Sequence, residues 1–322
     1  MTVHAKSPLL VLVGPTAVGK TELSLQLAEE LGTDIISGDS MCLYRGFDIG
    51  SAKPTREEQA RVAHHLVDVL AAEATFSVTE FVARVDALVR THAAEGRLPF
   101  VVGGTGLYIK ALVEGYHFNE TSTHASFRRA MEGIARRRGN VRVHSFLAHR
   151  DPAAAERLHA NNLRRVIRAL EVVRYGAESI SQECAHAGGE SPYDAFVVGL
   201  SRGRAHLYER INARVEEMFA AGLPDEVAGL LACGVSRDAP AMKGIGYRET
   251  AAYLAREMSR SDAIRAIQTA TRHFAKRQMT WYRRMSYIRW YDADTLTASE
   301  LLRAILVDVR AWLEERERSA QA

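Results

Sequence analysis

The chain has 322 residues, 47% of them hydrophobic, and a formal net charge of +3 at pH 7. This composition is typical of a globular protein, and the length suits a core domain with an insertion or a second domain. No apolar run approaches the ~20 residues of a membrane span, and Met1–Ser7 is too short and polar for a signal peptide. Three scattered cysteines (Cys42, Cys184 and Cys233) argue against a zinc site or a disulfide framework. We therefore expect a cytoplasmic protein that does not enter a membrane.

The first predicted elements are a buried strand over Leu9–Val13 and a helix over Glu22–Leu31. Between them lies a match to G-x-x-x-x-G-K-[ST], which reads Gly14-Pro15-Thr16-Ala17-Val18-Gly19-Lys20-Thr21. In this strand–turn–helix context the pattern indicates a phosphate-binding loop, because its backbone N–H groups and the helix N-terminus face an anion. Lys20 supplies a point charge and the Thr21 hydroxyl can hold Mg²⁺. The motif predicts a polyphosphate ligand but does not distinguish ATP from other diphosphates.

The elements that follow predict an α/β core with a parallel sheet. Apolar runs predict strands over 34–37, 99–102 and 195–200, and 287–290 reads as a last strand. Helical periodicity predicts a helix over Ser77–Ala94 and another that carries Leu207 and Phe219 on one face. From about Asn119 to Gly189 strand alternation disappears and the composition favours helices. We therefore predict a P-loop catalytic core over residues 1–118 and 191–322, interrupted by an all-helical insertion domain over 119–190.

Ligands of such sheets bind beyond the carboxyl ends of the strands. There the sequence places Asp39 and Thr105 beside the phosphate loop. Asp39 is a candidate proton acceptor, although it could instead hold Mg²⁺ or cap a helix, and Thr105 could donate to a leaving oxygen or be a turn residue. Arg210 and Arg214, one helical turn apart, could reach phosphate or face solvent.

Positive charge is concentrated in two segments. Between Arg128 and Arg174 twelve arginines stand against four acids, an excess of eight positive charges. The second segment, from Arg272 to Tyr291, has no acid and interleaves basic residues with aromatic ones such as Phe274 and Trp281. Arginines for phosphates and rings for splayed bases are what loop or single-stranded RNA requires. Each segment alone could also be a solvated helical face.

Several blocks closely resemble the tRNA dimethylallyltransferase (tRNA isopentenyltransferase) family. They follow the family order from Leu9 to Tyr282, and Cys42 stands where a glutamine is common in the family. The blocks are Gly14–Thr21, Asp39–Pro54, His64–Asp68, Gly103–Tyr108, Asn161–Val172, Gly244–Glu249 and Thr271–Tyr282.

The resemblance implies transfer of a dimethylallyl group from dimethylallyl diphosphate to the exocyclic amine of the adenosine just 3′ of the anticodon. It implies Asp39 as the base, Thr105 as a donor to the bridging oxygen and Gly14–Thr21 on the diphosphate. From their place on one helix face we predict Arg210 as a catalytic cation and Arg214 on the diphosphate, although the sequence leaves open which of the two contacts the diphosphate. The expected cofactor is Mg²⁺ on Thr21, and the expected partner is a tRNA anticodon stem-loop, bound by a monomer. The implied tRNA-binding residues are Asp39, Ser40, Met41, Cys42, Thr105, Arg128, Arg164, Arg165, Val166, Ile167, Arg168, Arg272, Lys276, Arg277, Gln278 and Trp281.

Two other activities use parts of the same pattern. A P-loop small-molecule kinase would share the loop and Asp39, but it would leave the basic segments unexplained. An adenylate isopentenyltransferase would prenylate a free nucleotide and would need no tRNA clamp. A non-catalytic RNA-binding protein would not need both Asp39 and Thr105 beside a phosphate loop.

Overall fold

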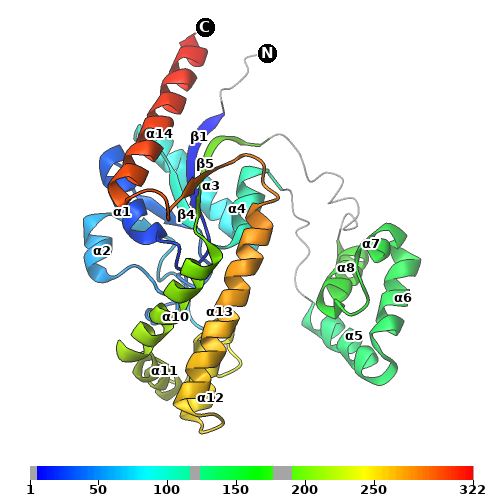
Figure 1. Ribbon diagram of the computed structural model, residues 1–322. Coiled ribbons are helices and arrows are strands. Elements are labelled where there is room, and N and C mark those ends of the chain that lie inside the picture. The colour runs from blue at the N-terminus through cyan, green and yellow to red at the C-terminus, as the bar shows by residue number, and fades with distance from the viewer. Residues whose placement is uncertain (1–5, 117–123, 177–190, 322) are drawn as a thin grey trace. The chain divides into compact units, whose positions relative to one another are not determined.

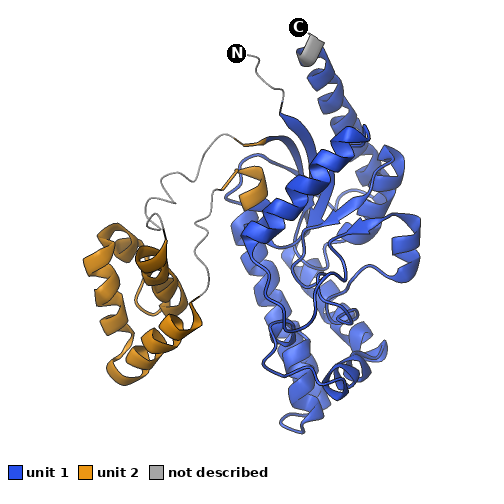
Figure 2. Ribbon diagram, turned by 180° about the vertical axis from the view of Figure 1, so that it is seen from behind, with its two compact units in different colours: residues 1–110, 193–322 blue, residues 111–192 orange. Residues whose placement is uncertain are grey.

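The computed structural model describes residues 6–116, 124–176 and 191–321. The chain divides into two compact units, residues 1–110 with 193–322 and residues 111–192, which we call the core unit and the helical unit (Figure 2). The predicted insertion boundaries, 119 and 190, lie outside the described residues.

The core unit contains a six-stranded sheet in the order β3-β2-β4-β1-β5-β6. Its central strands β4, β1 and β5 are labelled in Figure 1. Each strand runs parallel to its neighbours, and Val13 at the end of β1 aligns with Gly103 of β4 and Gly199 of β5. The carboxyl ends of the central strands therefore lie along one edge. The strands are β1 (Ser7–Val13), β2 (Ile35–Ser37), β3 (His64–His65), β4 (Phe100–Gly103), β5 (Tyr193–Ser201) and β6 (Ile288–Asp292).

Helices surround the sheet, which explains the unbroken apolar run of β1, where Leu9–Val13 is fully buried. Leu10 and Leu12 belong to one core cluster with residues of α1 and α14, and these two helices contact each other. The helix α3 contacts β1 as well, and its Ser77 N-cap forms a capping box with Glu80. These helices are α1 (Lys20–Leu31), α2 (Arg56–Arg61), α3 (Val78–Ala94), α4 (Gly106–Val113) and α14 (Ala298–Gln321).

A second group of elements in the core unit has its own apolar core. Phe47 and Tyr247 lie at its centre, with ring centroids 4.7 Å apart. The long helix α13 contacts both α10 and α12, and its Ala275 belongs to the core cluster of the sheet. The elements are α10 (Arg204–Ala220), α11 (Leu223–Ala232), the 3₁₀ turn η1 (Ala241–Lys243), α12 (Tyr247–Leu254) and α13 (Arg260–Tyr282).

The helical unit packs its helices around a small apolar core. The helix α6 contacts α5, α7 and α8, and Val143, Leu147 and Val166 are buried among them. The helices are α5 (Ala125–Arg138), α6 (Asn140–Arg150), α7 (Pro152–Arg157) and α8 (Leu163–Tyr175).

These elements confirm the predicted fold class and the five predicted strands, with bounds that differ by one or two residues. The strand β3 was not predicted, because two residues carry no periodicity.

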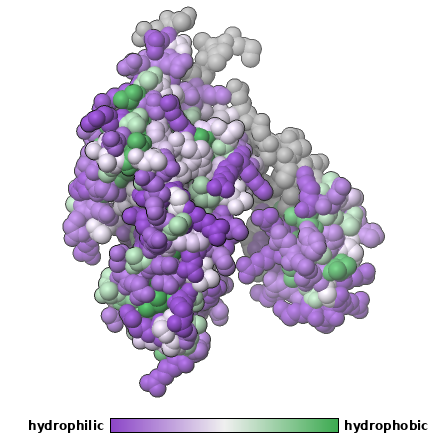
Figure 3. All heavy atoms as spheres, in the orientation of Figure 1, coloured by the Kyte–Doolittle hydropathy of each residue, from purple (hydrophilic) through white to green (hydrophobic). Residues whose placement is uncertain are grey.

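None of the helices in the described part of the chain combines the length and the apolar composition that a bilayer span requires. The face seen in Figure 3 is mostly hydrophilic.

Candidate active site

The phosphate loop joins β1 to α1, as its sequence predicts. Gly14 and Gly19 have φ angles of 157° and 113°, which glycine adopts without strain. A Cβ on Gly14 would also lie 3.0 Å from the Leu200 carbonyl oxygen of β5. Val18 is buried and packs in the main core, which holds the loop against the sheet.

Lys20 begins α1 and turns back over the loop. Its Nζ donates to the carbonyl oxygens of Gly14 and Pro15, at 2.8 and 2.9 Å. Burial lowers the pKa of Lys20 to about 8, while Asp39 opposes this effect and Arg214 adds to it. The two carbonyl oxygens that bind the ammonium are uncharged and leave its positive charge unneutralised. The ammonium can therefore serve as the counter-charge of a bound anion. Thr21 follows it and lines the same cleft.

The ends of β2 and β4 approach each other closely beside the loop. A Cβ on Gly103 would lie 2.6 Å from the Gly38 carbonyl oxygen, so glycine is required there. This contact brings Thr105 to the loop after β2, where its Oγ1 accepts from the Ser40 N–H at 3.2 Å. The Asp39 carboxylate is half-buried, and its Oδ1 accepts from the Met41 N–H at 3.0 Å. Asp39 and Thr105 are thus together, as predicted.

The helix α10 brings two arginines to the loop from the other side. The Nε of Arg210 donates to the Ala17 carbonyl oxygen at 2.9 Å, and the rest of this side chain is exposed. Arg214 is half-buried. Burial lowers the pKa of Arg214, whereas the charge of Asp39 acts to raise it. Arg214 therefore does not simply face solvent, which was the alternative to a phosphate contact.

All of these groups except Thr105 line one cleft of about 760 Å³, and Thr105 contacts its lining residue Ser40. Its polar part includes Lys20, Thr21, Asp39 and Arg214, and its apolar part comes mainly from α10 and α13. Its volume is in the usual range of ligand pockets, and its mixed lining suits an anion with an apolar tail. The apolar residues that line it include Ile211, Val215, Met218, Ile245, Ile267 and Phe274.

Gln278, an implied tRNA contact, is buried and hydrogen-bonded within the protein. It is 4% exposed, its Oε1 accepts from the Thr16 N–H at 2.9 Å, and its Nε2 donates to the Gly104 carbonyl oxygen at 2.7 Å. Its amide therefore ties the phosphate loop to the end of β4. Both ends of the amide are used inside the protein, although Gln278 also lines the cleft, and its direct contact with tRNA stays a prediction.

The other implied residues of α13 are divided between its faces. Lys276 and Arg277 are exposed, whereas Trp281 is half-buried against Gly106. Arg272 donates to the Asn212 Oδ1 at 2.6 Å and to the Thr269 Oγ1 at 2.9 Å, so it is held against α10.

The loop after β2 carries Met41 and Cys42 toward the cleft. Both line it, but Cys42 is 6% exposed. Burial, with the nearby charge of Asp39, raises the pKa of the Cys42 thiol well above its usual range. Cys42 can therefore offer a neutral thiol at the cleft wall and not a thiolate.

Sequence reasoning missed the residue that shapes the next turn of this loop. Glu226 of α11 accepts from the N–H groups of Asp48, Ile49 and Gly50, at 2.7 to 3.3 Å. It also accepts from the Tyr247 hydroxyl at 2.8 Å. The only available signal was the Gly244–Glu249 block, which contains Tyr247.

In the helical unit the implied tRNA contacts differ in exposure. Arg164 and Arg165 are exposed and have no ion pair with any carboxylate among the described residues. Val166 and Ile167 are 0% and 3% exposed and form part of the core. Side-chain contacts of these two residues with tRNA are excluded by their burial, which corrects the prediction.

Arg128 and Arg168 are both paired with Glu171, whose side chain is fully buried. The shortest nitrogen–oxygen distances are 2.6 Å from Arg128 and 2.9 Å from Arg168. Although burial acts to raise it, hydrogen bonds from Arg128, the His124 N–H and Arg168 lower the pKa of Glu171 to about 2. The two guanidiniums are therefore fixed to α8 while more than a third of each remains exposed.

A cluster of Asp34, His65 and His92 lies at the opposite end of β2 from Asp39. The Oδ2 of Asp34 lies 2.9 Å from the His65 Nε2, and Arg97 approaches the same oxygen to 2.6 Å. A guanidinium on this oxygen competes with any metal ion, so the cluster is best described as an ion-pair network between β2, β3 and α3.

Comparisons with known proteins identify the family of the chain. Residues 42–285 match the model of the family described as IPP transferase. Among curated relatives, tRNA dimethylallyltransferases of Bacillus anthracis and Bacillus cereus are each 44% identical over 301 residues, with 93% of this chain and 96% and 95% of those proteins covered.

Solved structures give the same result. A tRNA isopentenylpyrophosphate transferase from Bacillus halodurans is 38% identical, covers 98% of this chain and all of its own, and has a TM-score of 0.74. A eukaryotic dimethylallyltransferase solved acting on tRNA shares the fold, with a TM-score of 0.83 over 96% of this chain and 80% of its own, at 23% identity. The chain belongs to the IPP transferase family.

Proposed function

We propose that this protein is a tRNA dimethylallyltransferase, which transfers the dimethylallyl group of dimethylallyl diphosphate to the exocyclic amine of the adenosine just 3′ of the anticodon. The observation that carries the proposal is one cleft lined by a phosphate loop with Lys20, by Arg214 and by Asp39, with Thr105 hydrogen-bonded to the lining residue Ser40. Relatives at 44% identity over 93% of the chain bear this name.

The reaction requires a nucleophile and a stabilised leaving group. The adenine nitrogen forms a bond to C1 of the dimethylallyl group, the C1–O bond breaks, and its electron pair leaves with the diphosphate. Asp39 receives the proton that the amine loses. Its carboxylate is half-buried beside the loop and keeps Oδ2 available for that proton, since Oδ1 accepts from Met41.

The diphosphate gains charge as it leaves, so cations near it stabilise the transition state more than the ground state. Lys20 is oriented by two carbonyl oxygens and Arg214 converges on the same place from α10. Arg210, whose Nε donates to the Ala17 carbonyl oxygen, lines the same cleft. Thr105 donates its hydroxyl proton to the bridging oxygen once that oxygen replaces Ser40 Oγ, which now lies 3.5 Å away.

Thr21 offers a hydroxyl oxygen at the cleft, a hard donor of the kind that Mg²⁺ prefers. When bound there, Mg²⁺ would neutralise diphosphate charge. Activity that survives complete chelation of divalent ions would contradict this part of the proposal.

The acceptor adenine must leave its stacked loop to reach the cleft. The exposed Arg164, Arg165, Lys276 and Arg277 provide phosphate contacts for a stem-loop. A cytoplasmic monomer acting on tRNA is the simplest form of this proposal.

The test is single-turnover prenyl transfer to tRNA by wild type and Asp39→Asn. We expect the variant to lose at least ~10²-fold in rate, the usual contribution of a positioned base. Its affinity for tRNA and for the donor should change little, because the amide keeps the shape. An unchanged rate would mean that Asp39 is not the base. Efficient ATP hydrolysis would favour a kinase, and prenylation of free AMP but not of tRNA would favour an adenylate isopentenyltransferase.

A further inference from the structure

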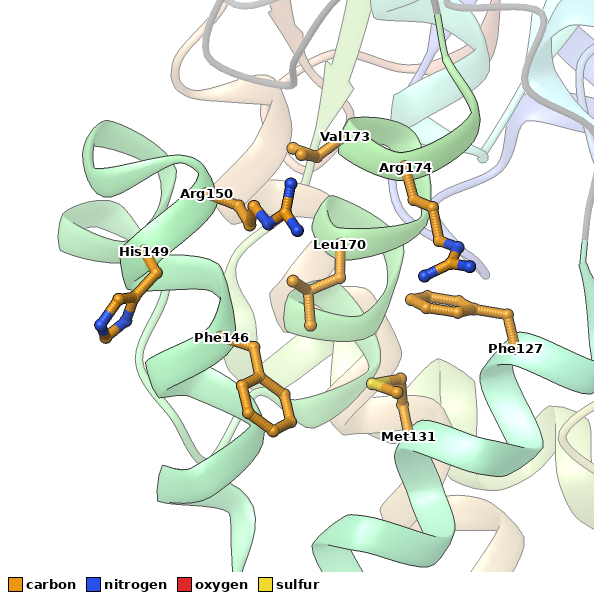
Figure 4. A pocket seen from close by; sticks show the side chains of 8 residues that line it. All are labelled: Phe127, Met131, Phe146, His149, Arg150, Leu170, Val173 and Arg174. Atoms are coloured by element: carbon orange, nitrogen blue, oxygen red, sulfur yellow. The ribbon is translucent and has the colours of Figure 1, made fainter.

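The helical unit has an open pocket of its own, of about 420 Å³, between α5, α6 and α8 (Figure 4). Phe127 and Met131 come from α5, Phe146 from α6, and Leu170 from α8. Leu170 is 6% exposed, whereas the other three are half-buried and leave part of their surface to solvent. The floor is therefore apolar and aromatic, although the unit as a whole is rich in arginine.

Two arginines stand at the mouth of this pocket. The side chains of Arg150 and Arg174 lie on either side of Leu170 in Figure 4, and the Arg174 guanidinium lies over the Phe127 ring, 5.9 Å from its centroid. Both residues are exposed, and neither forms an ion pair with a carboxylate of the described residues. Glu171, one turn from Arg174, is already occupied by Arg128 and Arg168.

Two unpaired cations above an aromatic floor are complementary to a nucleotide. A phosphate satisfies several guanidinium N–H groups at once. An unstacked base gains from contact with Phe and Met side chains and needs no specific hydrogen bond for it. An apolar peptide segment would use the floor but not the two cations.

We propose that this pocket binds one unpaired nucleotide of the RNA, with its base on Phe146 and Met131 and its phosphate between Arg150 and Arg174. The inference rests on the proposed function and extends it. The site lies away from Arg164 and Arg165 at the start of α8, and it holds a base other than the one that is prenylated.

The first experiment removes the cations. Arg150→Gln with Arg174→Gln is compared with Arg136→Gln with Arg138→Gln, which removes the same charge from exposed positions of α5 outside the pocket. We expect the pocket pair to weaken binding of a synthetic anticodon stem-loop about tenfold more than the control pair. Its log–log salt slope should also fall by about 0.7 more, the value for one single-strand phosphate contact.

The second experiment identifies the base. Stem-loops with one abasic loop position each are titrated against wild type and Phe146→Leu. We expect one position, distinct from the prenylated adenosine, at which base removal costs wild type about tenfold in affinity and the variant little. If Phe146→Leu fails to fold, the exposed arginine pair decides alone.

The outcomes separate the two proposals. Equal affinities and slopes for the pocket and control pairs, or an abasic scan without such a position, would overturn the pocket even while prenyl transfer proceeds normally. Tight base-dependent binding at Phe146 without any transfer to tRNA would instead overturn the proposed function and leave the pocket.

Discussion

The pairing of Glu171 with Arg128 and Arg168 leads to the prediction that is most tightly fixed by the structure. Glu171→Gln keeps the size of a fully buried side chain and removes its charge. The pKa of Glu171 is lowered from 4.5 to about 2, which corresponds to about 3 kcal/mol of native-state stabilisation at neutral pH. Because both arginines are 37% exposed, we reduce the expected loss to about 2 kcal/mol.

The sign of the pH dependence follows from the lowered pKa. The stabilisation is complete above about pH 4.5, the ordinary value, and is lost as the pH falls through about 2. The difference between wild type and Glu171→Gln should therefore be largest near neutrality and shrink in acid.

Hydrogen exchange followed by mass spectrometry measures this loss locally. A decrease of about 2 kcal/mol in opening free energy makes the amides of α5 and α8 exchange about 30-fold faster at pH 7. Peptides of the core unit serve as the internal reference, and Glu132→Gln, an exposed acid on α5, is the matched control. Unchanged exchange of α5 and α8 in Glu171→Gln would refute the reasoning.

Three further predictions concern the core unit and the tRNA contacts. The pKa of Lys20 is lowered to about 8, and its charged form binds the donor. The kcat/KM for dimethylallyl diphosphate should therefore fall about tenfold per pH unit above pH 8. A kcat/KM that stays constant up to about pH 10 would contradict this. Gln278→Leu removes the bridge between Thr16 and Gly104, so the KM for the donor should rise about tenfold. The affinity for the stem-loop, measured by calorimetry, should stay the same. A loss of tRNA affinity would identify Gln278 as a tRNA contact. Replacing Arg164 and Arg165 together with Ala should weaken tRNA binding and reduce the slope of log affinity against log salt concentration by about one unit per phosphate contact. Identical salt titrations of tRNA affinity for variant and wild type would mean that these arginines only face solvent.

The sequence was sufficient for the parts of the protein that depend on neighbouring residues. The loop Gly14–Thr21 has its strand before it and its helix after it, so pattern and context predicted it together. Val101, Val197 and their neighbours form strands because uninterrupted apolar runs must be buried on both faces of a sheet. The rule that ligands bind at strand ends then predicted Asp39 near Thr105. In the structure Asp39 lines the cleft, and Thr105 contacts the neighbouring Ser40.

The tertiary structure decided which polar groups are used inside the protein. The hydrogen-bonding groups of Gln278, Arg272 and Arg128 are known from the sequence, but their partners are not. These partners, Thr16, Asn212 and Glu171, are all far away along the chain. Val166 and Ile167 belong to the same block as Arg164, yet the helical period directs them into the core. Burial and long-range hydrogen bonds depend on packing between elements, and that packing is set by the whole chain and not by any local pattern.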